Sequence, residues 1–185
     1  MKNLFDEFPF LRDDCIIIKK MVEEDVDALM EITDNPNIYK YIPPFLYKKS
    51  RGNLLAAIRN LGARDFNSKK MIIAGIYLCA EPDRLTGLAE MFDYKKRSGQ
   101  MTIGYRLNEL YWHRGIATEA VKLMTNYLCN DMGIQTLQAF VMPENVFSEK
   151  ALLKNGFTKE NHTVQEKNWG GKDIVDLNVF TYSRK

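Results

Sequence analysis

The sequence predicts a single domain of the mixed α/β class, because segments with helical and with strand patterning alternate along the chain. Two helices follow a first short strand, and three strands then run between residues 71 and 107. A further strand-helix-strand unit over residues 101–141 predicts a parallel crossover, which is right-handed in nearly all proteins. We therefore expect a central sheet that is mixed and mostly antiparallel, with helices flanking it.

The chain begins with a segment that has no regular pattern. We expect residues 1–13 to be an irregular N-terminal extension of a domain that spans residues 14–185. Phe5, Phe8 and Phe10 of the extension are free to pack against that domain. The next run, Cys15-Ile16-Ile17-Ile18, is rich in β-branched residues and predicts a short buried strand.

Two helices are expected before the central strands. The first begins at Glu23-Glu24-Asp25, whose charges suit the positive end of a helix, and ends at Asp34-Asn35-Pro36. Residues 37–50 contain adjacent prolines and predict a loop, or a short helix followed by a loop. In the second helix apolar residues recur at helical spacing over residues 54–61, and Gly62 should end it.

Three strands are expected to form an antiparallel meander. Their predicted bounds are residues 71–80, 88–94 and 101–107. Turns should separate them at Glu81-Pro82-Asp83 and at residues 95–99.

The remaining elements alternate between helix and strand. Apolar residues with a period near 3.6 predict a helix over about residues 115–130, which Asp131-Met132-Gly133 ends. A strand over residues 136–141 and a short helix over 145–154 follow. Asn155-Gly156-Phe157 is typical of a Schellman helix end. Two closing strands flank Gly170-Gly171, and the last spans residues 174–182.

The composition shows no bias toward one class of partner. Of 185 residues, 45% are hydrophobic and 27% are charged, and the net charge of +2 gives no bulk attraction to nucleic acid or to a membrane. No apolar run approaches the roughly 20 residues that cross a bilayer, and the N-terminus has no secretory signal pattern. The three cysteines lie in apolar segments, so we expect reduced, buried thiols and a cytoplasmic location. The two histidines predict no metal site.

Residues 111–120, YWHRGIATEA, make an unusual start to a helix. They place Gly115 beside the basic His113 and Arg114, with no acidic residue in the first turn, whereas helix starts favour Ser, Thr, Asp or Asn caps and acidic neighbours. The N–H groups of this turn would point to one place and favour an anion the size of a pyrophosphate, to which Thr118 can add a hydroxyl donor. Alternatively, Gly115 only permits tight packing and the basic side chains are solvated; the spacing leaves both open.

Two common nucleotide-binding motifs are absent. No Lys-Ser/Thr pair follows the glycine, so the segment is not a P-loop. The sequence also has no G-x-G-x-x-G, and a meander rather than an N-terminal βαβ unit precedes the helix, so a dinucleotide fold is excluded.

The segment Ile103-Gly104-Tyr105-Arg106-Leu107 followed by YWHRGIATEA resembles the acetyl-CoA site of the GNAT N-acetyltransferases. Within this superfamily it is most similar to the branch of ribosomal-protein-alanine N-acetyltransferases. A second match, Asn145-Val146-Phe147-Ser148 and then Lys154-Asn155-Gly156-Phe157, lies about 30 residues downstream, as in that branch. With a weaker match over residues 25–42, the resemblance covers nearly the whole chain from residue 14.

The resemblance implies a single-domain GNAT fold, in which strands around residues 104 and 137 splay apart and the pantetheine arm of acetyl-CoA lies between them like an added strand. The pyrophosphate would then lie on the N–H groups of residues 113–118. Acetyl-CoA is the implied co-substrate, and no metal is implied. The implied cofactor-binding residues are Leu107, Asn108, Glu109, His113, Arg114, Gly115, Ile116, Ala117, Thr118 and Asn145.

The implied reaction is aminolysis of a thioester, which requires a neutral amine. At pH 7, conversion to the neutral form costs a lysine amine with a pKa of ~10.4 roughly 4–5 kcal/mol, whereas it costs an α-amino group with a pKa of ~7.8 only about 1 kcal/mol. Glu90, in an otherwise apolar strand, is the candidate base; the alternative is a solvent-facing residue on an alternating strand. The acidic residue that the family often has before Ile-Gly-Tyr is Thr102 here.

Ser148 is the candidate acid for the leaving thiolate. The tyrosine that many superfamily members place seven residues after the asparagine is Leu152 here, and the ribosomal-protein branch has a serine at the position of Ser148. The alternative role for Ser148 is hydrogen bonding in the first turn of the short helix that Asn145 begins.

The acceptor is expected to be a primary amine, either a protein N-terminus or a small molecule such as a polyamine or an aminoglycoside. A non-catalytic CoA-binding module is a further alternative. An apolar-aromatic wall for the acceptor is expected from Tyr39, Tyr41, Pro43, Pro44 and Phe45. The sequence is compatible with a monomer or a homodimer.

Overall fold

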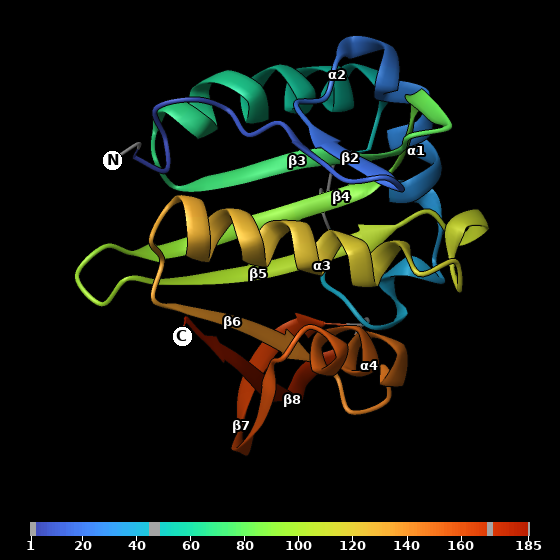
Figure 1. Ribbon diagram of the computed structural model, residues 1–185. Helices are drawn as coiled ribbons and strands as arrows, with labels where there is room; N and C mark the ends of the chain where they lie inside the picture. Colours follow the sequence, from blue (N-terminus) through green and yellow to red (C-terminus); the bar gives the residue numbers. More distant parts are fainter. Residues whose placement is uncertain (1–2, 45–48, 170–171, 185) are drawn as a thin grey trace.

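The computed structural model describes residues 3–44, 49–169 and 172–184, and it contains the predicted elements in the predicted order (Figure 1). One strand is added at the start of the chain. The strands are β1 (Leu11–Arg12), β2 (Ile16–Lys19), β3 (Met71–Leu78), β4 (Glu81–Lys95), β5 (Gln100–Leu107), β6 (Thr136–Val141), β7 (Thr158–Trp169) and β8 (Lys172–Ser183). The α-helices are α1 (Val26–Asp34), α2 (Arg51–Asn60), α3 (Ile116–Asn126) and α4 (Val146–Lys154).

The strands form one mixed sheet in the order β1-β2-β3-β4-β5-β6-β8-β7. β5 and β6 are parallel, and the other neighbouring pairs are antiparallel, as predicted. β5 pairs with β6 only over Gln100–Thr102, which lie opposite Thr136–Gln138. Beyond this point the two strands diverge (Figure 1), so the predicted splay is confirmed and β5 has an open edge toward Leu107.

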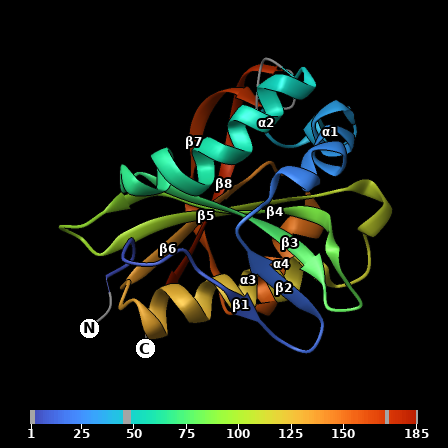
Figure 2. The same cartoon turned by 90° about the horizontal axis from the view of Figure 1, so that it is seen from above.

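Helices cover both faces of the sheet. α1 and α2 lie on one face and α3 and α4 on the other (Figure 2). Because side chains alternate between the faces of a strand, Ile16 and Ile18 of β2 join the core beneath α3, whereas Ile17 joins the core beneath α1 and α2. Burial on both faces explains why β2 is a continuous apolar run rather than an alternating one.

The N-terminal extension is more ordered than predicted. Leu11–Arg12 pair with β2 as the edge strand β1. Phe5 and Phe8 pack on Phe66 with ring centroids 5.7 Å and 5.1 Å apart, as expected, but Phe10 is 64% exposed. Backbone pairing with the edge of β2 therefore holds Leu11–Arg12 as a strand, although their own sequence has no strand pattern.

Two predicted boundaries were wrong. Gly62 does not end the second helix, which continues through Asp65 as a π-helical turn, η3 (Leu61–Asp65). A Cβ at Gly62 would lie 2.2 Å from Cε of Lys20, so this glycine makes room for a side chain instead. The turn after β3 falls at Cys79-Ala80, and Glu81-Pro82-Asp83 already belong to β4, where the Pro82 carbonyl accepts from Lys19 Nζ at 2.9 Å.

Three features of the C-terminal half bear on the predictions. α3 continues as a π-helical turn, η5 (Tyr127–Asp131), and the chain then turns at Gly133 with φ of 74°. α4 ends in the predicted Schellman motif, since Phe157 N–H donates to the Leu152 carbonyl at 3.2 Å and Gly156 has φ of 81°. Gly170-Gly171 lies outside the described residues.

The cysteine prediction was only partly right. Cys129 is buried, Cys79 is half-buried, and Cys15 is exposed, because it lies in the bend before β2 rather than inside the strand. Within the described residues, no helix is long and apolar enough to cross a membrane.

Candidate active site

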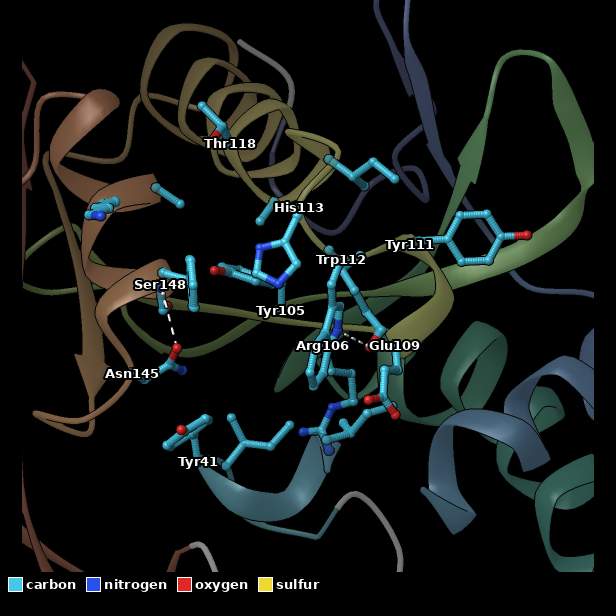
Figure 3. Close-up of a pocket in the computed structure, with 18 of the residues that line it drawn as sticks. Tyr41, Tyr105, Arg106, Glu109, Tyr111, Trp112, His113, Thr118, Asn145 and Ser148 are labelled. Atoms are coloured by element: carbon cyan, nitrogen blue, oxygen red, sulfur yellow. Dashed lines mark hydrogen bonds between the residues drawn. The ribbon is translucent and has the colours of Figure 1, made fainter. Parts of the chain in front are cut away.

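A pocket of about 590 Å³ lies against the end of β5, beyond the last residue that pairs with β6 (Figure 3). Four parts of the chain form it: η2 (Ile38–Lys40) with the residues after it, the end of β5, the loop and first turn of α3, and α4 with the residues before it. Of the sequence-predicted site residues, it brings together Leu107, Glu109, His113, Gly115, Ile116, Ala117, Thr118, Asn145 and Ser148. Asn108, Arg114 and Glu90 do not line it.

The start of α3 has the geometry expected of an anion site. Gly115 is the N-cap with φ of 78°, His113 has φ of 61°, and no side chain in the described part of the chain caps the helix. Backbone of this kind turns successive N–H groups into a concave cluster that suits anions. A Cβ at Gly115 would meet no atom within 4 Å, so the glycine does not serve tight packing. The left-handed conformation and the space beside the helix are what require glycine.

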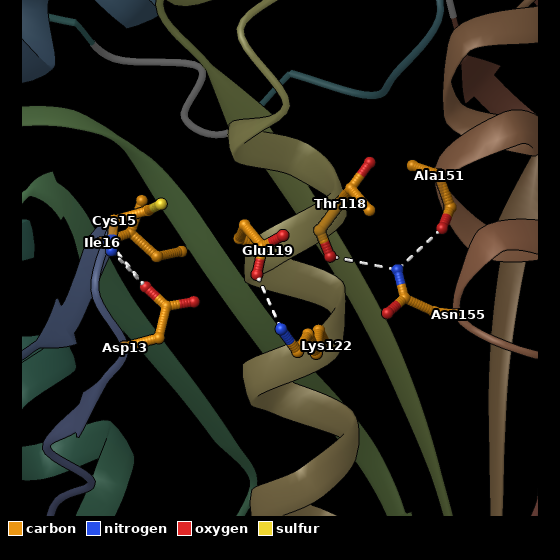
Figure 4. A network of polar contacts seen from close by, with 8 residues as sticks. All are labelled: Asp13, Cys15, Ile16, Thr118, Glu119, Lys122, Ala151 and Asn155. Carbon is orange, nitrogen blue, oxygen red and sulfur yellow. Dashed lines mark hydrogen bonds and ion pairs between the residues drawn. The ribbon is translucent and has the colours of Figure 1, made fainter.

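One sequence expectation at this helix was wrong. Its first turn does contain an acidic residue, Glu119. Its carboxylate is directed away from the pocket, toward Lys122 at 3.1 Å and toward the Asp13 side of the sheet (Figure 4). The negative charge therefore does not compete for the N–H groups that face the pocket.

The two basic residues before α3 lie differently. The Arg114 guanidinium lies over the Tyr111 ring, 5.3 Å from its centroid, outside the pocket. His113 lines the pocket (Figure 3). Its ring makes an edge-on contact with Phe147 of α4, with ring centroids 4.6 Å apart. His113 thus joins the α3 side of the pocket to the α4 side.

Asn145 and Ser148 form the first turn of α4. Asn145 is the N-cap, and its Oδ1 accepts from the Ser148 backbone N–H at 3.3 Å. The hydrogen bonding in the first turn that the sequence allowed for Ser148 is therefore present, but through its backbone N–H. The Ser148 side chain is not used in the cap: it forms a hydrogen bond with the Tyr105 phenol. Burial raises the pKa of Tyr105, and the hydrogen bond with Ser148 lowers it to a smaller extent.

Leu107 and Asn108 shape the turn that leads from β5 to α3. The Leu107 carbonyl accepts from Trp112 Nε1 at 3.0 Å, and the Asn108 N–H donates to the Thr86 carbonyl at 2.9 Å. The Asn108 side chain accepts from the Leu110 N–H at 3.1 Å and donates to Glu31 at 2.9 Å. These bonds make Asn108 a buried support of the turn. Trp112, which the sequence did not single out, anchors it from the α3 side.

Glu90 faces neither solvent nor the pocket directly. Its carboxylate forms an ion pair with Arg106, and the two side chains are only 13% and 5% exposed. Arg106 also donates to the Pro43 carbonyl at 3.2 Å and lines the pocket. The pair therefore ties β4 and β5 to the segment after η2.

Glu109 lies at the rim of the pocket, where two asparagines hold it. Asn35 Nδ2 donates to its carboxylate at 2.7 Å and Asn37 Nδ2 at 3.0 Å. Hydrogen bonds from Asn37 and then Asn35 hold the pKa of Glu109 below its usual value. The sequence marked Asn35 only as a helix end, because a contact across 74 positions has no local pattern.

The wall formed by η2 and the residues after it contains part of the predicted aromatic surface. Ile38, Lys40, Tyr41 and Ile42 line the pocket. Tyr39 and Pro43 instead contact Arg106, and Phe45 lies outside the described residues. Among the described residues, no group of three or more His, Cys, Asp or Glu side chains is arranged to hold a metal ion.

Comparison with known proteins identifies the family. Residues 16–158 match the model of the acetyltransferase (GNAT) domain. An uncharacterized N-acetyltransferase, p20, of Bacillus licheniformis is 26% identical over 172 residues, which are 92% of this chain and 93% of the relative.

Solved structures share the fold. RimJ of Mycobacterium smegmatis, in complex with CoA-disulfide, has a TM-score of 0.80 at 17% identity over 95% of this chain and 86% of that one. MccE, a microcin C7 self-immunity acetyltransferase in complex with acetyl-CoA and AMP, has a TM-score of 0.78 at 19% identity over 92% and 93%. The splayed strands, the uncapped start of α3 and the match over most of the chain lead to one conclusion: this chain belongs to the GNAT family and is an acetyl-CoA-dependent N-acetyltransferase.

Proposed function

We propose that this enzyme transfers the acetyl group to a primary amine, and that the amine is an α-amino group at the N-terminus of a protein or peptide. The observation that carries the proposal is the extent of the pocket. One cavity contains the uncapped start of α3, the end of β5 and the wall made by Tyr41 and Ile42. A bound thioester and an amine that enters from the Tyr41 side would meet in the same space.

The cofactor placement follows from the unsatisfied backbone. The pyrophosphate would accept from the N–H groups at the start of α3, where Gly115 leaves open space, and Thr118 would add a hydroxyl donor. The pantetheine arm would lie along the β5 edge that β6 no longer covers, near Leu107, and beside Asn145.

The choice of an α-amino group rests on proton transfer. Glu90 was the candidate base, but its carboxylate is held in the ion pair with Arg106, where it balances the charge of a buried guanidinium. Conversion to the neutral form at pH 7 costs an α-amino group only about 1 kcal/mol, so water can deprotonate it. The same conversion costs a lysine roughly 4–5 kcal/mol. With Glu90 committed to Arg106, the less basic amine suits the site better, because it needs less help to lose its proton. We assign Glu90 to positioning Arg106.

The leaving thiolate can be protonated from α4. Ser148 lines the pocket and is hydrogen-bonded to the Tyr105 phenol. We assign Ser148 as the acid that delivers a proton to sulfur, with Tyr105 positioning its hydroxyl. The neutral amine attacks the thioester carbon directly, and the C–S bond of the tetrahedral intermediate then breaks as sulfur takes the Ser148 proton. The attacking nitrogen loses its extra proton to water, from which Ser148 is reprotonated, so that the products are the amide and the free thiol.

The names of two structural neighbours agree with this acceptor class. RimL, described as a ribosomal alpha-N-protein acetyltransferase in complex with coenzyme A, has a TM-score of 0.81 at 16% identity. A further neighbour is described as a putative ribosomal-protein-serine acetyltransferase of Vibrio cholerae, with a TM-score of 0.76 at 14% identity. At this identity the neighbours share the fold, and the acceptor must be tested directly.

The test is release of free thiol from acetyl-CoA over matched amines at pH 7. One peptide has a free N-terminus and no lysine; a second has a blocked N-terminus and one lysine; spermidine and an aminoglycoside represent small amines. We expect the first peptide to react fastest by at least ten-fold. A faster reaction with a small amine would overturn the acceptor class. Thermal protection by acetyl-CoA without thiol release from any amine would identify a CoA-binding module instead.

A further inference from the structure

A carboxylate in the η2 half of the pocket has no part in the reaction described above. Glu109 lines the pocket, and the two amides that hold it, from Asn35 and Asn37, belong to the segment that leads into η2. In Figure 3 the Glu109 carboxylate lies on the side of η2 and Arg106, whereas Thr118 of the proposed pyrophosphate site lies at the opposite end. The carboxylate therefore belongs to the acceptor side of the pocket.

The Glu109 carboxylate is held in one orientation. Asn37 Nδ2 lies 3.0 Å from both of its oxygens, and Asn35 Nδ2 lies 2.7 Å from Oε2. The Asn35 amide is itself oriented, because its Oδ1 accepts from the Asn37 backbone N–H at 2.9 Å. The direction of the carboxylate is thus set before any acceptor binds, which reduces the entropy that binding must remove.

The two amides orient the charge of Glu109 but do not neutralise it. Among the described residues, no Lys, Arg or His side chain forms an ion pair with Glu109. Two cationic side chains from η2 and β5 line the same pocket, but Arg106 pairs with Glu90, and the Lys40 ammonium lies 5.3 Å from the centre of the Tyr41 ring. The amides also hold the pKa of Glu109 below its usual value, so the group is ionised at neutral pH.

An aromatic side chain lies on the same side of the chain as this carboxylate. The single 3-10 turn η4 (Glu109–Tyr111) is closed by the Trp112 N–H, which donates to the Glu109 carbonyl at 3.1 Å. In such a turn the side chains at positions i and i+3 lie above one another, and Glu109 and Trp112 both line the pocket (Figure 3). The bond from Trp112 Nε1 to the Leu107 carbonyl at 3.0 Å fixes the ring. A carboxylate beside a tryptophan favours a cation, above all the planar guanidinium of arginine.

Resting on the proposed function, we propose that Glu109 and Trp112 form a subsite for a cationic side chain of the acceptor, an arginine or a lysine at its second or third residue. The α-amino group reaches the thioester near the end of β5, and an extended peptide then advances by about 3.3 Å per residue toward the rim where Glu109 lies. Successive side chains of an extended peptide point to opposite sides, so one of these two positions faces Glu109. The acceptors are then polypeptides with a basic N-terminal sequence.

The test compares peptides that differ in one charge. Each peptide begins with serine, contains no lysine and carries arginine, citrulline or glutamate as its second residue; another series carries them as its third residue. Citrulline has the shape of arginine without its charge. Thiol release at saturating acetyl-CoA gives KM and kcat for each peptide. In one of the two series we expect wild type to have a KM about five-fold lower for arginine than for citrulline with a similar kcat, since exposed ion pairs change affinity only a few-fold.

Three variants assign the effect to Glu109. Glu109→Gln, which keeps the size of the side chain, should reduce the difference between arginine and citrulline to about two-fold or less, and Glu109→Lys should favour the glutamate peptide. Glu24→Gln removes the same charge from an exposed position outside the pocket and should keep the full difference. In wild type, about 0.5 M salt should weaken the preference, because salt screens exposed charges.

Four results would overturn the proposal. Wild type could show equal KM values for arginine and citrulline in both series, which would remove the subsite and leave the proposed function intact. Wild type could instead favour glutamate, which would assign this half of the pocket to Lys40, or Glu109→Gln could keep the preference for arginine. A loss of acetyl-CoA affinity in Glu109→Gln, measured by calorimetric titration, would place the carboxylate on the cofactor. Thiol release from none of the peptides would refute the proposed function and the subsite together.

Discussion

The role of Gly115 can be tested by replacing it with glutamate. The substitution adds a Cβ where φ is 78°, and it adds a carboxylate beside the N–H groups proposed to hold the pyrophosphate. Nothing within 4 Å obstructs the new Cβ in the protein itself. The cost to folding should therefore come from the backbone alone, and the effect on binding from charge and occupied space.

Both magnitudes can be estimated. A non-glycine residue in the left-handed region costs about 1–2 kcal/mol, which lowers the melting temperature of a domain of this size by roughly 2–8 °C. For a carboxylate held one Debye length, about 8 Å, from two phosphate charges, at an effective dielectric of about 20, the repulsion is about 4 kcal/mol before screening. Screening over one Debye length at physiological salt reduces this to about 1.5 kcal/mol, so acetyl-CoA should bind at least about ten-fold more weakly.

The assay is calorimetric titration with acetyl-CoA together with thermal unfolding. Gly133→Glu is a matched control, because Gly133 has φ of 74° but lies beyond the far end of α3 and outside the pocket. It should lose similar thermal stability and keep its affinity. If Gly115→Glu bound acetyl-CoA as tightly as wild type, the pyrophosphate would not lie at the start of α3.

Four further predictions concern the described side chains. Ser148→Ala should lower kcat by about ten-fold or more with little change in melting temperature if Ser148 protonates sulfur, and an equal loss of stability and rate would assign it to the helix turn. Glu90→Ala should lower the free energy of unfolding by about 3–5 kcal/mol, because it removes the carboxylate that balances the charge of buried Arg106; adding Arg106→Met should restore part of that loss in chemical denaturation. Iodoacetamide should label exposed Cys15 in the native protein but not Cys129, as checked by peptide mass spectrometry. Burial raises the pKa of Cys129 to about 11 from an ordinary 9.0, so its protonated form stabilises the fold below pH 9, and this stabilisation should fade as the pH rises toward 11.

Local patterning was sufficient for most of the fold. The spacing of the apolar residues predicted α2 and α3, and the run of three strands predicted the meander, because each of these features depends on residues within a few positions of one another. The Schellman end of α4 was readable for the same reason: Gly156 and the bonds around it span only six residues. β1 was not readable, since its strand conformation comes from pairing with β2 rather than from its own sequence.

The sequence by itself determined the start of α3, since a glycine that needs a positive φ and a helix without a side-chain cap are properties of residues 111–120 alone. Tertiary structure decided what surrounds it. Gly62 made room for Lys20, Glu90 met Arg106 across a strand pair, and Glu109 met Asn35 and Asn37 more than 70 positions away. Side chains of this kind acquire their partners only when the sheet and helices pack. For that reason one short segment was enough to predict the cofactor site, whereas the pairing of charged side chains around the acceptor could not be predicted from the sequence.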